Sequence, residues 1–342
     1  MSALPRSLAE PASARAGEAL VDIRGLTKLY SVETGFLAKA KSVLSAVEDF
    51  DVAIFRGETL GLVGESGSGK STVARLLPRL IEPTRGEVLY EGSNIFDLSG
   101  RALRRLRRKV QIVFQDPYSS LNPRHSVGRI ISEGIEDGRR GRARRVAELL
   151  DLVGLSSDVL DRYPHEFSGG QRQRICIARA LAVDPEFLVL DEPVSALDVS
   201  IQSKILNLLH DLKKKLNLTY LFISHDLGVV HHIADRVAVM YLGHLVELAP
   251  KRVLYANPLH PYTQALLSAV PTTTRRTGTN GRVPLTGEIQ SPIDIPPRCR
   301  FATRCPRQIE RCWQEVPRLE EVERDHLVAC FNFARLERAA AS

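Results

Sequence analysis

The sequence predicts an α/β protein with a mostly parallel sheet that helices cover on both sides. Short apolar runs alternate with longer segments whose apolar residues recur at helical spacing. Such alternation is typical of parallel strands joined by helices. Residues 187–190 (FLVL) are apolar at every position, as expected of a parallel strand buried on both faces. Because 342 residues exceed one typical domain, we expect a large core domain and an appendage.

Composition places the chain among soluble globular proteins. Charged residues make up 25% and apolar residues 44% of the sequence. No stretch approaches the ~18 consecutive apolar residues that a membrane-spanning helix needs. Residues 1–19 are rich in Ala, Ser and Pro without the apolar run of a secretory signal, so we expect a disordered leader. The protein is therefore expected to stay in the cytoplasm.

The net charge of +7 is concentrated in two arginine-rich runs, at residues 101–109 and 139–145. Such runs can contact nucleic acid or an anionic membrane surface. They are more often a solvated helix face, which is the interpretation we favour. Neither run contains an aromatic residue for base stacking. We therefore predict no nucleic-acid partner, and leave contact with a membrane face open.

The first part of the chain is expected to contribute four strands and one helix. The strands are predicted at residues 21–23, 50–55, 60–63 and 87–90. The segment 31–45 has no clear periodicity and is assigned to neither class. A helix is predicted over residues 72–80, where Pro78 should bend it or end it early.

The second part is expected to continue the alternation. A strand at residues 110–114 ends at Gln115, and a helical insert follows at about 116–165. A helix is predicted over residues 174–182. One face of the next helix carries Ile201, Ile205, Leu208, Leu212 and Leu216. The remaining strands are predicted at residues 187–190, 219–223, 236–241 and 245–248.

A glycine-rich loop between strand 60–63 and helix 72–80 fits G-x-x-x-x-G-K-[S/T]. In this context the backbone N–H groups and the helix N-terminus form a phosphate cradle. Lys70 is expected to reach the β- and γ-phosphates, and the Ser71 hydroxyl to hold Mg²⁺. An ordinary flexible glycine loop is the alternative. The predicted nucleotide-binding residues here are Gly64, Glu65, Ser66, Gly67, Ser68, Gly69, Lys70, Ser71 and Thr72.

Polar residues follow three of the other predicted strands. Asp191 ends an apolar strand and is expected to hold Mg²⁺ through its water shell. Glu192 comes next and could orient or deprotonate an attacking water. His225 could touch a γ-phosphate, and Gln115 could complete a Mg²⁺ or water contact. Alone, each of these residues would be read as part of a solvated turn or as structural.

A second anion-binding arrangement precedes helix 174–182. Ser168 can cap the helix, while Gly169 and Gly170 expose backbone N–H groups. A plain capped helix start is the alternative. One nucleotide needs only one phosphate cradle, so a second cradle must serve something else.

Together, these motifs and their order resemble the ATP-binding subunit of an ABC transporter. The resemblance covers residues 20–255 and implies a P-loop ATPase domain with a mostly parallel core sheet, an antiparallel N-terminal sheet and a helical subdomain. It makes Glu192 the catalytic glutamate, Gln115 the Q-loop glutamine and His225 the switch histidine. Tyr30 matches the aromatic residue that stacks on adenine, although a buried strand-edge tyrosine is an equal alternative. The remaining motifs are Walker A (64–71), the signature (Ser168, Gly169, Gly170 and Gln171), Walker B (188–191) and the D-loop (195–198).

The resemblance also implies partners. Two such subunits pair head to tail, so that the signature of each closes over the ATP of the other. The partner is either a copy or a paralogue. Two membrane-spanning permeases and a periplasmic or extracellular substrate-binding protein complete such a system. This chain is expected as a peripheral ATP hydrolase at the cytoplasmic side of the inner membrane. A non-transport ATPase acting on ribosomes or DNA is a rival, but a second cassette or a long coiled coil is missing from the sequence.

The C-terminal part, residues 256–342, resembles the extension of oligopeptide and dipeptide importer ATPases. The segments 257–263 (NPLHPYT) and 114–124 (FQDPYSSLNPR) carry this resemblance. Gln171 is similar to the second ATPase of such two-ATPase systems. Related importers take up nickel or sugars, so the cargo stays open.

Four cysteines, Cys299, Cys305, Cys312 and Cys330, fall in this extension, separated by five, six and seventeen residues. These spacings are not the C-x-x-C pairs of common zinc sites. The spacings resemble those in the extension of peptide-importer ATPases, some of which hold a four-iron–four-sulfur cluster on these thiols. We favour Fe–S over zinc or free thiols. A metal or redox sensor that the cassette merely docks is the other possibility. Cys176 is expected to be a small buried hydrophobe.

Overall fold

The computed structural model describes residues 19–33, 41–136, 138–269 and 290–333. The predicted leader, apart from Ala19, lies outside the described residues. Within the described part of the chain, no helix combines the length and hydrophobicity needed to cross a bilayer.

An antiparallel sheet is built mainly from the N-terminal part of the chain. Its strands are β1 (Ala19–Glu33), β2 (Lys41–Phe55), β4 (Arg85–Tyr90) and β5 (Ser93–Asn94), in the order β2-β1-β4-β5. β1 and β2 are much longer than predicted and enter segment 31–45 from both sides. Register shifts interrupt their pairing at several points, and Gly25 and Asp49 have positive φ. These irregularities break the apolar–polar alternation that reveals a strand in a sequence.

The second sheet has eight strands in the order β11-β12-β10-β9-β3-β8-β7-β6. The five strands from β9 to β6 pair in parallel, and β10, β12 and β11 add to one edge antiparallel. The predicted mostly parallel core sheet and antiparallel N-terminal sheet are thus confirmed. The strand bounds are β3 (Thr59–Val63), β6 (Val110–Val113), β7 (Phe187–Asp191), β8 (Thr219–Ser224), β9 (Arg236–Tyr241), β10 (His244–Pro250), β11 (Glu320–Glu323) and β12 (His326–Val328).

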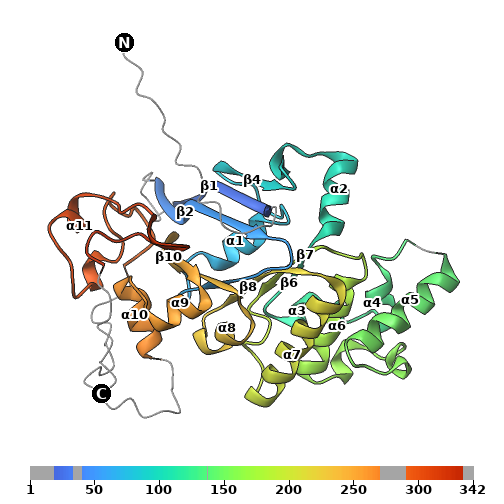
Figure 1. Cartoon of the computed structure of the whole chain (residues 1–342). Helices are drawn as coiled ribbons and strands as arrows, with labels where there is room; N and C mark the ends of the chain where they lie inside the picture. Colours follow the sequence, from blue (N-terminus) through green and yellow to red (C-terminus); the bar gives the residue numbers. More distant parts are fainter. Residues whose placement is uncertain (1–18, 34–40, 137, 270–289, 334–342) are drawn as a thin grey trace, which may run out of the picture.

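Helices cover both faces of this sheet (Figure 1). α1 ends earlier than predicted, because Pro78 follows and Arg79 has positive φ. α6 begins earlier than predicted, because Ser168 caps it. The helices are α1 (Lys70–Leu76), α2 (Gly100–Lys109), α3 (Pro117–Ser120), α4 (Val127–Ser132), α5 (Arg139–Leu152), α6 (Gly169–Leu181), α7 (Val199–Leu216), α8 (Leu227–Ile233), α9 (Lys251–Ala256), α10 (Pro261–Ser268) and α11 (Arg311–Gln314). Short 3₁₀ turns lie at Ile95–Asp97, Ser157–Val159, Pro164–Glu166 and Ala302–Arg304.

Two hydrophobic clusters fill the spaces on either side of the parallel sheet. In β7, Phe187 and Val189 belong to the cluster shared with α1 and the antiparallel sheet. Leu188 and Leu190 belong to the cluster that includes residues of α6, α7 and α8. The strand is therefore buried on both faces, as its uninterrupted apolar run predicts.

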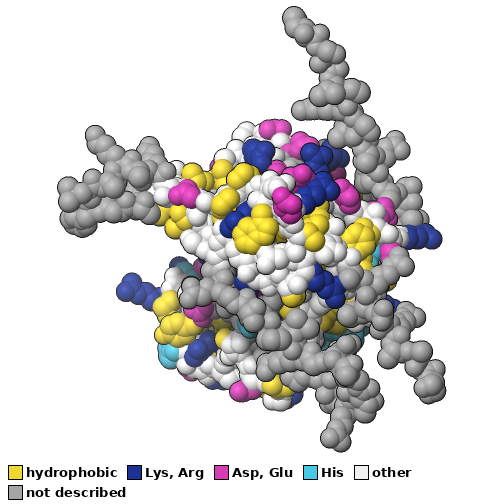
Figure 2. All heavy atoms as spheres, turned by 90° about the vertical axis from the view of Figure 1, so that its left-hand side faces the viewer, with side chains coloured by type: hydrophobic (Ala, Val, Ile, Leu, Met, Phe, Trp, Pro, Cys, Tyr) yellow, Lys and Arg dark blue, Asp and Glu magenta, His cyan; other side chains and the backbone are white. Residues whose placement is uncertain are grey.

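The two appendages lie at opposite ends of the molecule (Figure 1). The insert with α3, α4 and α5 lies at one end. At the other end, residues 290–333, here called the cysteine lobe, lie beside α10 and add β11 and β12 to the sheet edge. On the lobe's side of the molecule, apolar side chains lie among charged ones (Figure 2). The exposed large hydrophobic residues of the lobe are Ile309, Trp313, Val316 and Phe333.

Both arginine-rich runs form helices. Leu106 is the buried residue of α2, while Arg101, Arg104 and Arg105 are exposed. In α5, Arg140, Arg142 and Arg144 are exposed, and Val146, Leu149 and Leu150 face the core. The solvated-face interpretation therefore agrees with the structure.

Candidate functional site

The phosphate loop, residues 64–71, joins the end of β3 to the start of α1. All five residues of β3 are buried, so the loop starts from a fixed point. Gly69 has φ of +104°, and a Cβ built on it would lie 2.1 Å from the carbonyl oxygen of Ala46. Both the backbone conformation and the close approach require glycine here. The loop thus keeps its backbone accessible against a tightly packed support.

Lys70 is held against the loop's own backbone. Its side-chain Nζ donates hydrogen bonds of 2.8 Å to the carbonyl oxygens of Gly64 and Glu65 and lies 3.4 Å from the Ser68 hydroxyl. The residue is only 4% exposed, and this burial lowers the pKa of its ammonium group, although nearby carboxylates favour the charge. A partly desolvated cation directed into a backbone cradle is suited to bind phosphate.

Ser71 and Asp191 bring two oxygen donors together. The Ser71 hydroxyl donates a 3.1 Å hydrogen bond to Oδ1 of Asp191, which is buried at the end of β7. Burial raises the pKa of this carboxyl, and the bond from Ser71 partly offsets the shift. Hydroxyl and carboxylate oxygens are ligands that Mg²⁺ prefers, so this pair fits a magnesium ion bound with a nucleotide. The backbone N–H of Thr72 donates to Gly69.

Glu192 connects the ends of three strands. Its Oε2 accepts a 3.1 Å hydrogen bond from the side-chain amide of Gln115 and lies 3.0 Å from Nδ1 of His225. The Glu192 side chain is 12% exposed and the His225 side chain 55%. Glu192 also has φ of +48°, a conformation that non-glycine residues adopt mainly at functional or turn positions. The predicted residues Gln115, Glu192 and His225 are therefore in direct contact.

The signature residues lie apart from this group. Ser168 and Gln171 form a reciprocal capping box at the start of α6, and Ser168 is exposed. A Cβ on Gly170 would lie 2.5 Å from Cγ2 of Ile201, so this glycine is needed for packing. Among the described residues, no hydrogen bond or ion pair joins Ser168–Gln171 to the phosphate loop. The chain thus presents two anion-binding arrangements that are not connected within one copy.

Tyr30 lies in β1 with 38% of its surface exposed, and the Lys28 ammonium lies 4.9 Å from its ring centre. It is not a buried strand-edge tyrosine, which was the alternative to a stacking role. Its ring is available to a ligand, and adenine stacking stays a prediction.

The sequence did not reveal that the C-terminal part touches the phosphate loop. Tyr262, at the start of α10, and Arg304, in the cysteine lobe, both contact Glu65. The NPLHPYT segment gave a family likeness but no sign of this contact, and Arg304 lies in no motif. A contact between residues 239 positions apart leaves no periodic pattern in a sequence.

The four cysteines of the extension are gathered in the cysteine lobe. The backbone N–H of Cys299 donates to the carbonyl oxygen of Cys312 at 3.1 Å. The pKa of Cys299 is raised to about 11 and that of Cys330 to about 12, mainly by burial and to a smaller extent by the neighbouring thiols. Within the described ranges, however, no three His, Cys, Asp or Glu side chains are placed to hold a metal ion. The donor chemistry fits a metal, while the arrangement as it stands does not yet provide a ligand set. Cys176 is buried, as predicted.

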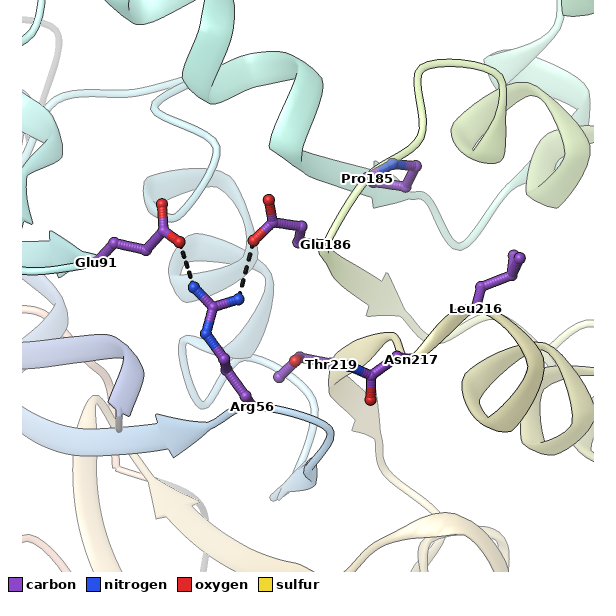
Figure 3. A pocket seen from close by; sticks show the side chains of 7 residues that line it. All are labelled: Arg56, Glu91, Pro185, Glu186, Leu216, Asn217 and Thr219. Carbon is purple, nitrogen blue, oxygen red and sulfur yellow. Dashed lines mark hydrogen bonds and ion pairs between the residues drawn. The ribbon is translucent and has the colours of Figure 1, made fainter. Parts of the chain in front are cut away.

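A further pocket lies at the opposite end of the parallel strands (Figure 3). Arg56 lies between Glu91 and Glu186 and is paired with both, and Lys109 pairs with the same two carboxylates. These charges neutralise one another and connect the two sheets. The pocket therefore carries no part of the nucleotide site.

Comparison with known families identifies two regions of the chain. The family described as "ABC transporter" matches residues 47–195. The "Oligopeptide/dipeptide transporter, C-terminal region" matches residues 246–312. The first region spans the phosphate loop, Gln115, the signature and Glu192. The second covers most of β10, all of α10 and the first three cysteines of the lobe.

Curated relatives match over nearly the whole chain. The oligopeptide transport ATP-binding protein AppF of Bacillus subtilis is 49% identical, with 93% of this chain and 98% of the relative covered. The probable peptide ABC transporter ATP-binding protein y4tS of Sinorhizobium fredii is 51% identical, with 92% and 90% covered. The putative oligopeptide transport ATP-binding protein YkfD of Bacillus subtilis is 48% identical, with 91% and 97% covered.

Solved structures of ATP-binding cassettes share the fold. The cbiO1 protein of Clostridium perfringens, part of an ABC transporter complex, superposes with a TM-score of 0.61 at 29% identity, covering 70% of this chain and 91% of that one. A dimeric ATP-binding cassette in a post-hydrolysis state, bound to ADP and phosphate, gives a TM-score of 0.59 at 30% identity, covering 68% and 99%. The chain belongs to the ATP-binding, ATP-hydrolysing subunits of the ABC transporter family, in the group that carries the C-terminal region of the oligopeptide and dipeptide transporters.

Proposed function

We propose that this chain binds and hydrolyses ATP to power the import of oligopeptides or dipeptides through a membrane transporter. The observation that carries the proposal is the nucleotide half-site. It comprises the phosphate loop with Lys70 and Ser71, together with Gln115, Asp191, Glu192 and His225. The names of the relatives and the matching C-terminal region favour peptides over nickel or sugars as cargo.

The residues of the half-site divide the work of phosphoryl transfer. Lys70 leaves the carbonyls of Gly64 and Glu65 for the β- and γ-phosphates, and the loop N–H groups hold the phosphate oxygens. Mg²⁺, when bound near Ser71 and Asp191, neutralises phosphate charge. Glu192 uses Oε2 to bind Gln115 and His225, so Oε1 can accept a proton from the attacking water. Catalysis here is mainly positioning and electrostatic stabilisation.

The second anion-binding arrangement supports a shared pocket. We place Ser168, Gly169, Gly170 and Gln171 over the ATP of a partner subunit, because their helix start is exposed and unconnected to the phosphate loop. The solved cassette at 30% identity is a dimer. The partner is an identical or a paralogous ATPase, and Gln171 favours the second-ATPase type of a two-ATPase system. Tyr30 would stack on adenine in the same pocket.

The domain division follows from the same proposal. Residues 20–255 form the ATP-binding domain, and residues 256–342 form the extension. The insert at about 116–165 carries the motion of Gln115 to two membrane-spanning permeases. Tyr118, three residues after Gln115, is 60% exposed and is available for such a contact. The chain then lies at the cytoplasmic side of the inner membrane as a peripheral protein, and a substrate-binding protein delivers the peptide.

For the cysteine lobe we propose a four-iron–four-sulfur cluster on Cys299, Cys305, Cys312 and Cys330. Four neighbouring thiols are a donor set that suits Fe–S or zinc. The raised thiol pKa values mean that a bound metal must displace the protons. Anaerobically purified protein should be brown and absorb in the visible blue. Zinc alone in elemental analysis would refute the cluster.

Reconstitution tests the transport function. The chain, its permeases and its partner ATPase are placed in vesicles, and uptake of labelled di- and oligopeptides is measured with ATP. Peptide uptake that requires ATP hydrolysis is expected. Uptake of nickel or a sugar in place of peptides, or hydrolysis without any solute movement, would contradict the proposal.

A further inference from the structure

The phosphate loop is supported from outside the cassette by the C-terminal part of the chain. Glu65 is the first residue after Gly64, and it belongs to the loop whose carbonyls hold Lys70. Two residues from the C-terminal part converge on it. Tyr262 accepts a 2.8 Å hydrogen bond from the Glu65 backbone N–H, and Arg304 binds the Glu65 side chain.

The contact between Arg304 and Glu65 is a two-pronged ion pair. Nη1 of Arg304 donates to Oε2 at 2.8 Å, and Nη2 donates to Oε1 at 3.1 Å. Such parallel bonds fix direction as well as distance. The Arg304 side chain is 6% exposed and that of Glu65 23%, so water screens the pair little. The hydrogen bond to Glu65 is the main reason that the pKa of Arg304 is raised above its ordinary value.

The segment around Arg304 is itself firmly anchored. Nη1 of Arg304 also lies 3.3 Å from the Tyr241 hydroxyl, in β9 beside the phosphate-loop strand β3. Phe301 packs its ring against Tyr241 and Tyr262, with centroids 5.2 and 5.5 Å apart. The guanidinium therefore holds Glu65 from a rigid support rather than from a flexible surface loop.

A second arginine of the same segment holds the other side of the loop. Arg300 binds the carbonyl oxygen of Leu242 and the carboxylate of Glu48. Gly243, which follows Leu242 in the sequence, donates its backbone N–H to the Ser68 carbonyl oxygen at 2.8 Å. Arg300 and Arg304 thus support the loop at Ser68 and at Glu65, and both lie between Cys299 and Cys305.

We propose that Arg304 is a positioning residue for ATP binding, which keeps the phosphate loop in its binding conformation through Glu65. This inference rests on the proposed function and adds a residue of the extension to the nucleotide site. Arg304 touches neither Lys70 nor Glu192, so it acts on the cradle and not on the attacking water. Loosening the loop weakens the ground state and the transition state alike, which raises KM and leaves kcat nearly unchanged.

The test compares Arg304→Met, Glu65→Gln and the double variant in the full chain. Equilibrium binding of trinitrophenyl-ATP with Mg²⁺ is measured, and kcat and KM are measured in the assembled transporter. Each single variant should raise Kd and KM about tenfold, the loss expected for one charge-assisted pair. The double variant should bind no more weakly than the single variant with the higher Kd, because each single substitution already removes the same contact. Arg304→Lys, which keeps the charge, should recover part of the affinity.

Arg311→Met is the matched control, because Arg311 pairs with Glu315 on the surface of the same lobe. It should bind the nucleotide as the wild type does. Single variants that bind within twofold of wild type, or losses that multiply in the double variant, would overturn the proposal. If Arg304→Met does not fold, Glu65→Gln and Arg304→Lys decide the question alone. A wild-type transporter that hydrolyses no ATP would instead refute the proposed function.

Discussion

The nucleotide half-site and the cysteine lobe touch each other, but the chain alone completes them to different degrees. In the half-site, Ser71 already binds Asp191, and Glu192 already contacts Gln115 and His225. In the lobe, four thiols are neighbours, yet no three residues among those described form a ligand set. The chain alone therefore brings the residues of the half-site into contact, whereas in the described part of the lobe the thiols are not arranged as a ligand set.

The difference lies in what fixes the side chains. The half-site residues follow the ends of parallel strands, whose hydrogen bonds hold every functional group in register. Cys312 lies in a helix of four residues, and Cys299, Cys305 and Cys330 lie outside helices and strands. The thiols of Cys299 and Cys330 stay protonated at neutral pH, because burial raises their pKa. A sheet positions groups through its own hydrogen bonds, whereas the loop-rich lobe would be ordered further by the cluster proposed above.

The largest expected effect is at Glu192. Glu192→Gln keeps the shape of the side chain and removes the base, so hydrolysis should fall by about 10²–10⁴-fold while ATP is still bound. Steady-state turnover and nucleotide binding measure the two parts. Glu186→Gln, at the other end of the same strand, is the control, and it should keep turnover. Unchanged turnover in Glu192→Gln would remove Glu192 from its catalytic role.

The docking of the C-terminal part predicts a loss of stability in mild acid. His260 is buried, its Nδ1 accepts the backbone N–H of Tyr262, and burial lowers its pKa from 6.5 to about 4. As the pH falls, His260 is therefore protonated in the unfolded chain before it is protonated in the folded chain. The free energy of unfolding should decrease by roughly 3 kcal/mol between about pH 6.5 and about pH 4. Denaturant titration at several pH values measures this loss. His260→Asn, which can still cap α10, should abolish this part of the pH dependence, and an unchanged profile would contradict the assignment.

Gly69 tests the claim that the half-site is preformed. Gly69→Ala adds a Cβ 2.1 Å from the Ala46 oxygen at a positive φ. The distortion should cost about 1–3 kcal/mol and weaken ATP binding by about tenfold to a hundredfold, as measured by equilibrium binding. Gly138→Ala is the control, because Gly138 has φ of −60° and a Cβ added there would meet no atom within 4 Å. It should bind ATP as the wild type does. Equal affinities in the two variants would show that the loop is not held as described.

The smallest effect on turnover is expected from the cysteines. Cys299→Ser with Cys305→Ser should lose the bound metal and the visible absorbance, while kcat at saturating ATP changes by less than about twofold. No thiol contacts Lys70, Asp191 or Glu192 among the described residues. Iron content and turnover are measured on the same sample, and Cys176→Ala should keep the metal. A collapse of kcat would mean that the lobe takes part in catalysis.

The positions of the half-site residues are visible in the sequence for a physical reason. A phosphate cradle needs glycines, a lysine and a helix start in one short segment, so the loop at residues 64–71 is visible as a motif. Largely apolar runs in the sequence predict the parallel strands β7 and β8. The long strands β1 and β2 were mostly missed, because bulges and positive-φ residues such as Asp49 break their alternation.

The contacts of the extension could not be predicted in the same way. β12 pairs with β10 across about eighty residues, and Arg304 reaches Glu65 across 239. Both depend on tertiary packing and leave no local pattern. Resemblance marked residues 256–342 as an extension, but it did not indicate that this part contacts the phosphate loop.

The central claim is that one copy of the chain supplies half of each ATP pocket. The most direct test measures ATP hydrolysis per chain over a dilution series, with the mass of the particles recorded in each sample. Turnover should follow the fraction of paired ATPase subunits and vanish with the monomer. A monomer that hydrolyses ATP at the rate of the pair would contradict the account.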